Sequence, residues 1–349
     1  MRSARAVTCS LRLSIAVLFA ACLTAAKPAQ AETAIRFAIE KLDATAAPLL
    51  VALDKGYFRA EGLNVSLVLP VSPEPAEGSN DPINRIAAGD ADLGFGDLTA
   101  LLRARVEEQP AAVKAIYVVY NKPGYAVLGR KSRGIQSPGD LEGKKVGTPR
   151  RDPASSLWKA FVTASAIDGA KITTENIGLS VRDPMVASGQ IDAVTALSYQ
   201  SFIDIKERGV PASDISVIFM ADYGVKMYGA SILAGEKFAS ENADAVRGFL
   251  RAYARGLRET IAKPQSALEP VLKHDTTLSK ESELERLRMT IRDNIQTPET
   301  KANGYGGADM TRLSAAIDQV AAALELKKKP KAEELFDPSF LPARGKDER

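Results

Sequence analysis

The sequence predicts an α/β fold made of two similar lobes. Short apolar runs typical of strands alternate with helix-like segments from residue 34 onward, as in parallel sheets joined by helical crossovers. The chain has 349 residues, and at roughly 150 residues per domain this length predicts two domains or one large bilobal domain. A Gly-x-x-Asp phrase followed by an apolar residue occurs at 89–93 and again at 189–193. Two lobes of similar build explain this repeat, and coincidence is the alternative, because glycine after a helix is common.

The first lobe is expected to cover residues 32–127. A helix is predicted from Pro48 to Gly56, because proline suits a first turn and glycine suits a helix exit. Asp97 stands between a strand and a helix, where aspartate serves as an N-cap. Strands are expected at 34–39, 63–69, 92–95 and 115–120, and further helices at 82–89 and 98–108.

The second lobe is expected to cover residues 128–231 and repeats this alternation. Asp152 is predicted to cap a helix whose first turn contains Pro153 and which continues to residue 166. A shorter helix is expected to begin at Pro184. Strands are expected at 125–130, 144–147, 172–177, 192–196 and 217–220.

Residues 232–349 are expected to return to the first lobe and to add C-terminal helices. A strand at 229–233 begins this return. Apolar residues at helical spacing predict helices at 242–261, 282–295 and 310–326.

Residues 1–31 are predicted to be a secretory signal that is cleaved near Ala31. The segment has a basic start, an apolar run at 13–26 and small residues before the expected cut. The apolar run is shorter than the ~20 residues that a spanning helix needs. An uncleaved membrane anchor and a lipid anchor at Cys22 are the alternatives.

Removal of this segment changes the composition of the chain. Four of the 46 basic residues lie in it and none of the acidic ones, so 42 basic residues remain against 43 acidic residues. A nucleic-acid binder keeps a positive excess on its folded part, so we expect no nucleic-acid partner. Both cysteines, Cys9 and Cys22, also lie in the segment. We therefore expect neither a disulfide nor a cysteine-based metal site, and we expect no metal or cofactor.

Three phrases occur in an order that resembles a known family. They are KGYFRAEGLNV at 55–65, GDAD at 89–92 and LEGKKVG at 141–147. The chain is similar here to the sulfonate/nitrate/taurine-type substrate-binding proteins of ABC importers, a family that also includes proteins that bind or make the pyrimidine precursor of thiamine. The resemblance implies a type II periplasmic binding protein fold, with a central cleft and two hinge crossovers near 125–130 and 229–233.

The same resemblance implies a periplasmic protein that captures a small organic solute and delivers it to an ABC permease, and we expect a monomer. A sensory receptor and an enzyme acting on a pyrimidine or related metabolite are the alternatives. The enzyme of this family has a cysteine-rich motif and an active-site histidine. The chain without its signal has no cysteine and only His274, in a polar stretch. We therefore expect no catalytic residues.

The expected ligand-binding residues lie in loops after strands, because ligands in open α/β sheets bind beyond the carboxyl ends of strands and at helix N-termini. They are Asp43, Asp97, Thr99, Tyr120, Thr148, Arg150, Ser155, Ser156, Tyr199 and Tyr223.

The charged and aromatic members of this set predict the kind of solute. Arg150 and Arg151 favour an anion such as a sulfonate or carboxylate, through bidentate hydrogen bonds, unless both are solvated loop residues. The tyrosines favour a flat ring, unless they only pack in the core. An anionic or aromatic solute is therefore expected, although Leu42 and Asp43, in place of an aromatic residue, weaken a pyrimidine assignment.

Overall fold

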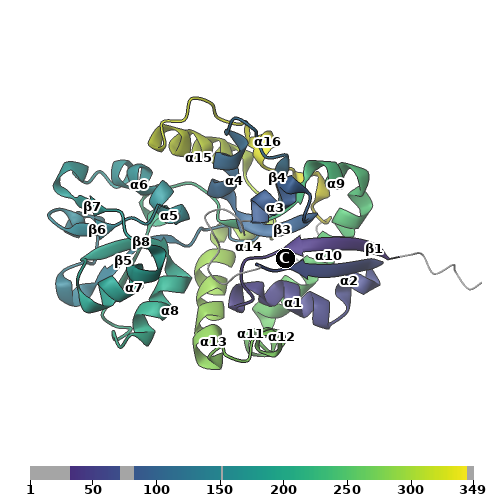
Figure 1. Ribbon diagram of the computed structural model, residues 1–349, viewed down its shortest axis with the longest axis horizontal. Helices are drawn as coiled ribbons and strands as arrows, with labels where there is room; N and C mark the ends of the chain where they lie inside the picture. Colours follow the sequence, from purple (N-terminus) through teal and green to yellow (C-terminus); the bar gives the residue numbers. More distant parts are fainter. Residues whose placement is uncertain (1–31, 71–81, 151, 344–349) are drawn as a thin grey trace, which may run out of the picture.

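A computed structural model of the protein describes residues 32–70, 82–150 and 152–343. These residues form two α/β lobes that lie next to each other, with several C-terminal helices at the junction (Figure 1). The predicted α/β class with two lobes is confirmed. The predicted signal segment and Arg151 lie outside the described residues. Within the described ranges, no helix is long and apolar enough to cross a membrane.

A five-stranded sheet forms the first lobe. Its strands are β1 (Thr33–Ala38), β2 (Leu63–Val68), β3 (Leu93–Asp97), β4 (Val113–Val118) and β10 (Ala230–Gly235). The order across the sheet is β2-β1-β3-β10-β4. β1 pairs in parallel with β2 and β3, whereas β10 runs antiparallel to both of its neighbours.

The sheet of the second lobe has the same design. Its strands are β5 (Tyr125–Arg130), β6 (Lys145–Gly147), β7 (Thr173–Glu175), β8 (Ala193–Leu197) and β9 (Ile215–Phe219). The order is β7-β6-β8-β5-β9, with β5 antiparallel to β8 and β9. In each sheet the antiparallel strand is the one that arrives from the other lobe.

The repeated Gly-x-x-Asp phrase has the same structural role in both lobes. Gly89 and Gly189 follow helices with positive φ angles of 81° and 77°, which glycine adopts without strain. The Asp92 carboxylate accepts a backbone N–H of β1 at 2.8 Å, and the Asp192 carboxylate accepts a backbone N–H of β6 at 2.8 Å. The repeat therefore reflects two lobes of similar build and not coincidence.

The chain crosses between the lobes through residues 119–124 and returns through residues 224–229. The predicted lobe boundaries at 127/128 and 231/232 are therefore displaced by a few residues. They fall inside β5 and β10, and each of these strands pairs along its length within one sheet, so neither can be divided between lobes.

Helices cover both faces of the first sheet. They are α1 (Ala47–Asp54), α2 (Tyr57–Ala60), α3 (Pro82–Ala88), α4 (Leu98–Arg105), α9 (Glu236–Glu241) and α10 (Ala243–Ala262). The KGYF phrase has structural roles here. Gly56 ends α1 with a φ of 68°, the Tyr57 hydroxyl donates to Glu259 at 2.5 Å, and the Phe58 ring stacks on Phe249 with centroids 4.8 Å apart.

The helices of the second lobe differ from the prediction at two places. They are α5 (Pro153–Ser156), α6 (Trp158–Ala164), α7 (Leu179–Ser188) and α8 (Ser198–Glu207). The single helix expected after Asp152 is broken at Leu157. α7 begins five residues before the expected start and carries Pro184 in its interior. It buries Arg182, Asp183 and Val186, and Arg182 forms an ion pair with Asp152.

The C-terminal helices contact both lobes, whereas the sequence predicts them as part of the return to the first lobe. They are α11 (Pro264–Ala267), α12 (Glu269–His274), α13 (Lys280–Met289), a π-helical turn (Thr290–Ile295), α14 (Pro298–Asn303), α15 (Met310–Ala323) and α16 (Ala332–Leu335). α13 packs against α8 of the second lobe and against the short 3-10 turn Ala44–Ala46 of the first lobe. α15 packs against α6.

Candidate functional site

The two lobes enclose a cleft with a volume of about 400 Å³. Its walls come from the loops after β1 and β3, from both crossovers, and from α5, α7 and α8 of the second lobe. This position beyond the strand ends is where open α/β sheets bind ligands. The volume suits a small organic molecule.

Asp97 ends β3 and caps α4 with one of its carboxylate oxygens. Oδ1 accepts the backbone N–H groups of Thr99 and Ala100 at 2.9 and 3.0 Å, and Oδ2 accepts the Tyr125 hydroxyl at 2.5 Å. The Tyr125 hydroxyl also lies 3.1 Å from the Thr99 hydroxyl. Asp97 therefore combines the predicted capping role with a place in the cleft wall.

Asp43 follows β1 and caps the short 3-10 turn that leads into α1. Its Oδ1 accepts the backbone N–H and the hydroxyl of Thr45 at 2.9 and 2.6 Å, and only 1% of the residue is exposed. Lys41 lies 3.7 Å from the other carboxylate oxygen, but its own side chain is 61% exposed. Asp43 is thus a buried carboxylate in the cleft wall, held by local hydrogen bonds.

Asp152 and Arg182 form a buried ion pair in the second-lobe wall of the cleft. Arg182 Nη1 lies 2.5 Å from Asp152 Oδ2, and the other guanidinium nitrogens bind Asp183 at 3.0 and 3.1 Å. The second Asp152 oxygen accepts the Ala154 N–H at 2.8 Å, which confirms the predicted N-cap. Burial raises the pKa of Asp152 to about 6, although the nearby Arg182 charge opposes this rise.

The raised pKa of Asp152 predicts a pH dependence of stability. Between about pH 4 and pH 6 the folded protein holds this proton more tightly than the unfolded chain, so stability from this group falls as pH rises. We expect the free energy of unfolding of the wild type, minus that of Asp152→Asn, to fall by roughly 2–3 kcal/mol from about pH 4 to pH 7. Urea titrations at several pH values measure it. A difference that stays constant with pH would refute the assignment.

Four aromatic rings line the cleft beside the carboxylates, and three of them pack against each other. Tyr120 lies edge-on to Tyr199 and to Phe95, with ring centroids 5.6 and 5.9 Å apart. Burial raises the pKa of Tyr120 and Tyr199 well above the usual tyrosine value, so both phenols stay neutral. These rings offer an apolar surface for a flat ligand.

Gly124, in the first crossover, provides the space that the Tyr199 ring occupies. A Cβ atom at this position would lie 2.6 Å from Tyr199 Cε1, which is shorter than any real contact. We expect Gly124→Ala to lower the free energy of unfolding by about 1–3 kcal/mol through overpacking. Tyr199→Leu should reduce this cost, because it removes the clashing atoms. A double-mutant cycle measured by urea denaturation tests the pair, and additive effects would contradict the clash.

The charges of the cleft wall do not favour an anion. The charged lining residues are Glu40, Asp43, Asp97, Asp152, Lys41 and Arg182. Four carboxylates thus stand against two cations, and the buried cation of the pair already serves two carboxylates. The described wall is therefore best suited to a ligand that donates hydrogen bonds or carries positive charge.

Of the ten residues predicted to bind the ligand, Asp43, Asp97, Tyr120 and Tyr199 line the cleft, and their contact with a ligand stays a prediction. The other six are not among its lining residues, and their contact with a ligand also stays a prediction. They are Thr99, Thr148, Arg150, Ser155, Ser156 and Tyr223.

The contacts and exposure of these residues explain why they lie outside the cleft lining. The hydroxyl of Ser155 lies 2.6 Å from that of Thr195, Ser156 accepts from Arg103, and Thr148 bonds to the carbonyl of Glu175. Arg150 is exposed and does not line the cleft, so it gives no support to the predicted anion preference, and Arg151 lies outside the described residues. Tyr223 is 37% exposed and packs edge-on against a phenylalanine.

Sequence reasoning missed Arg182, Tyr125 and Phe95 as lining residues, whereas Gln200 lies at the end of the loop 198–200 that the strand-end rule selects. Tyr125 begins β5 directly after the first crossover, and Gln200 lies in the first turn of α8. The strand-end rule does not select Tyr125, because this residue reaches the cleft from the amino end of an antiparallel strand. His274, expected at the surface, is exposed at the end of α12.

Comparisons with known proteins place the chain among binding proteins and their relatives. A formylaminopyrimidine-binding protein of Halalkalibacterium halodurans is 28% identical over 296 residues, which cover 82% of this chain and 84% of the relative. A 4-amino-5-hydroxymethyl-2-methylpyrimidine phosphate synthase of Aspergillus parasiticus is 28% identical over 236 residues, 64% of this chain and 65% of the relative. The solved periplasmic aliphatic sulphonate binding protein SsuA of Escherichia coli superimposes with a TM-score of 0.69 at 15% identity, covering 89% of this chain and 94% of SsuA.

The two similar sheets, the cleft between them and the likeness to SsuA define the class of the molecule as the periplasmic binding protein fold. Residues 43–267 match the family described as NMT1/THI5 like. The chain belongs to this family, whose members include binding proteins as well as proteins named as pyrimidine phosphate synthases.

Proposed function

We propose that the protein is an extracytoplasmic solute-binding protein that captures a flat, nitrogen-containing heterocycle bearing hydrogen-bond donors. The observation that carries this proposal is the pairing of buried carboxylates with aromatic rings in one cleft. Asp43, Asp97 and Asp152 are each buried or half-buried in the wall, next to Tyr120 and Tyr199. Carboxylates accept from ring amino groups, and the aromatic rings cover the apolar faces.

The relatives support this ligand class over the anionic one. The formylaminopyrimidine-binding protein is named for a nitrogen heterocycle, and its similarity extends over most of both chains. The likeness to the sulphonate-binding SsuA, at 15% identity, supports the fold alone. An anionic ligand would face four carboxylates without an unpaired buried cation in the described wall.

Delivery to an ABC permease is the role that accompanies such binding. The bilobal fold can close around a solute and present it to a membrane partner. The predicted signal segment agrees with this site of action. We expect deletion of the gene to abolish uptake of the solute at low external concentration, which radiolabelled uptake measures.

Titration calorimetry and thermal-shift measurements test the binding role. We expect one-to-one binding of formylaminopyrimidine or a related aminopyrimidine, with a melting temperature that rises with ligand concentration by mass action. An aliphatic sulfonate serves as the matched comparison and should not shift the melting temperature. Binding of the sulfonate alone would overturn the proposed ligand class.

The named synthases make an enzyme the second candidate. The described lining residues of the cleft include neither cysteine nor histidine, and they supply carboxylates and phenols in their place. Chromatography of each bound compound after incubation with the protein decides between the two roles. Recovery of unchanged compound supports a binding protein, whereas conversion of more than one equivalent per protein would establish an enzyme.

A further inference from the structure

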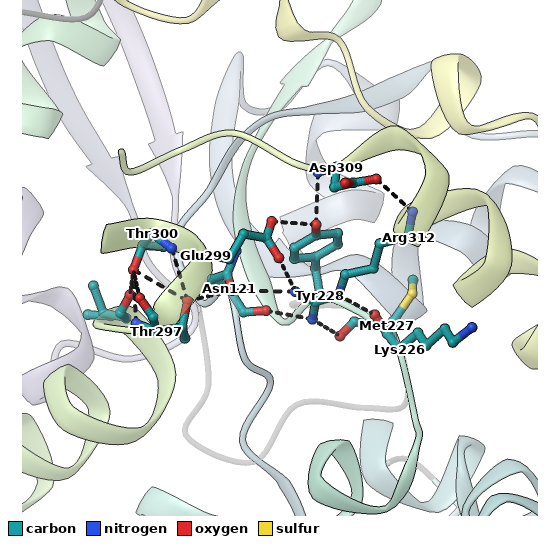
Figure 2. Close-up of polar contacts among 10 residues, drawn as sticks. Asn121, Lys226, Met227, Tyr228, Thr297, Glu299, Thr300, Asp309 and Arg312 are labelled. Atoms are coloured by element: carbon teal, nitrogen blue, oxygen red, sulfur yellow. Dashed lines mark hydrogen bonds and ion pairs between the residues drawn. The ribbon is translucent and has the colours of Figure 1, made fainter. Parts of the chain in front are cut away.

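Arg312, in the first turn of α15, donates hydrogen bonds to backbone carbonyls of both crossovers (Figure 2). Its Nη2 donates to the Asn121 carbonyl at 2.9 Å and to the Met227 carbonyl at 3.2 Å, and its Nε donates to the Lys226 carbonyl at 2.8 Å. The guanidinium also lies 3.9 Å from the centre of the Tyr228 ring. One side chain therefore binds the outgoing and the returning connection between the lobes.

Glu299 of α14 completes this cluster from the other side. Its two carboxylate oxygens accept from Arg312 Nη1 and from the Tyr228 hydroxyl, each at 2.7 Å. The Tyr228 hydroxyl in turn accepts the backbone N–H of Asp309, the N-cap of α15, at 2.8 Å. The side chains of Arg312 and Glu299 are 24% and 23% exposed, so the pair is largely shielded from solvent.

The crossovers also bind each other on the side that faces the cleft. The Gly229 N–H donates to the Tyr120 carbonyl at 2.9 Å, and the Tyr120 N–H donates to the Ala230 carbonyl at 3.0 Å. Gly229 favours this approach, because a Cβ atom there would lie 3.0 Å from Pro123 Cα, closer than nearly all real contacts of a Cβ atom. Tyr120, Gly229 and Ala230 all line the cleft. Asn121, which Arg312 binds, directly follows the lining residue Tyr120, and Tyr228, whose ring Arg312 covers, directly precedes the lining residue Gly229.

We infer that Arg312 is a positioning residue that joins the two crossovers into one hinge and thereby sets the affinity of a cleft that it does not itself line. The inference rests on the proposed function, in that ligand binding requires closure of the lobes. A hinge whose two strands move independently populates more interlobe arrangements, and the apparent affinity falls with the fraction of binding-competent molecules. The planar guanidinium binds several acceptors at fixed angles, which a lysine ammonium cannot reproduce.

The interlobe distance of the ligand-free protein tests this inference directly. Both native cysteines lie in residues 1–31, so Ala60→Cys and Thr174→Cys give two unique labelling sites in the protein without its signal. Both positions are exposed, on α2 and β7 at opposite ends of the molecule (Figure 1). We expect Arg312→Gln and Arg312→Lys to broaden the single-molecule fluorescence-transfer distribution between these labels.

Binding supplies the second readout. We expect Arg312→Gln to weaken the affinity for aminopyrimidines at least fivefold, while the ratio of the affinities for two different aminopyrimidines stays within twofold of the wild-type ratio. A ratio that changes more would place Arg312 in ligand recognition and overturn the inference. The distance measurement needs no ligand, so a failure to find a ligand would overturn only the proposed function.

Gln319 provides a matched control on the same helix. It contacts the second crossover alone, through Gly224 at 2.8 Å and Lys226 at 2.9 Å. Gln319→Ala should broaden the distribution less than Arg312→Gln, and equal broadening would show that coupling of the crossovers is not the cause. Glu299→Gln is the milder variant if Arg312→Gln does not fold, and it should broaden the distribution. A folded Arg312 or Glu299 variant with wild-type distances and affinity would overturn the inference.

Discussion

Arg182→Leu is expected to lower the free energy of unfolding by about 3–5 kcal/mol at neutral pH, the cost typical of removing one partner from a buried ion pair. Arg182 is 5% exposed and binds Asp152 and Asp183, which are 3% and 5% exposed. Without the guanidinium, two carboxylates remain buried beside each other. Urea denaturation followed by circular dichroism measures the loss.

Protonation should partly relieve this defect. The Arg182 charge holds the pKa of Asp152 down against burial, so its removal raises that pKa further. The loss of stability should therefore be smaller at about pH 5 than at about pH 8, because the neutral acid costs less to bury. Addition of Asp152→Asn to the Arg182→Leu variant should restore part of the stability at the higher pH.

An exposed ion pair provides the control for Arg182→Leu. Arg247 binds Asp244 at 3.0 Å within the first turns of α10, and the side chains are 43% and 103% exposed. Arg247→Leu should change the free energy of unfolding by less than about 1 kcal/mol, as is usual for surface pairs. Similar losses of unfolding free energy in the two variants would mean that the buried Asp152–Arg182 pair stabilises the fold no more than an exposed pair does.

Most of the fold could be predicted from the sequence because its elements are separated by strong local signals. Pro48, Gly56 and Gly189 mark helix boundaries through their own backbone preferences, and the structure places helix ends beside each of them. The start of α7 could not be predicted in this way. Pro184 resembles a helix start, yet it lies in the interior of a helix that begins at Leu179 and whose first turn buries Arg182 in an ion pair with Asp152.

This displaced helix start explains why Arg182 could not be predicted as a residue of the cleft wall. With the helix placed from Pro184 onward, Arg182 belongs to an apparent loop and has no reason to meet Asp152, 30 residues earlier. The sequence instead favours Arg150 as a ligand-binding residue, because a loop arginine next to a helix N-terminus fits an anion site. The loop instead turns Asp152 into the protein and leaves Arg150 exposed. Side-chain direction within a loop depends on tertiary contacts that the local sequence does not contain.

The strand-end rule succeeded where the side chain also has a local structural role. Asp43 and Asp97 each cap the helical turn that follows their strand, so their backbone positions were readable from the neighbouring sequence. Both caps face the cleft because the helices that they begin start at its wall. The proposed ligand contact therefore uses a carboxylate that also caps a helical turn, and the substitution of that carboxylate by an amide separates the two roles.

Asp97→Asn is expected to weaken the binding of an aminopyrimidine about tenfold to a hundredfold while keeping the cap of α4. The Tyr125 hydroxyl loses its carboxylate acceptor and keeps the Thr99 hydroxyl 3.1 Å away. Asparagine is as good an N-cap as aspartate, so its carbonyl oxygen can still accept from Thr99 and Ala100. The loss of charge removes about 1.5–3 kcal/mol, the usual contribution of a hydrogen bond to a charged group, from the ligand interaction. Titration calorimetry of the wild type and the variant measures the change.

Asp168→Asn is the control for Asp97→Asn, because it removes the charge of a capping aspartate that lies outside the cleft. Asp168 caps the short turn Gly169–Lys171 by accepting the Ala170 N–H at 3.1 Å, and it does not line the cleft. This variant should bind like the wild type. Asp97→Asn should also reduce the discrimination against sulfonates, because one negative charge has left the wall. Equal aminopyrimidine affinity in Asp97→Asn and the wild type would remove Asp97 from ligand recognition and leave it only the capping of α4.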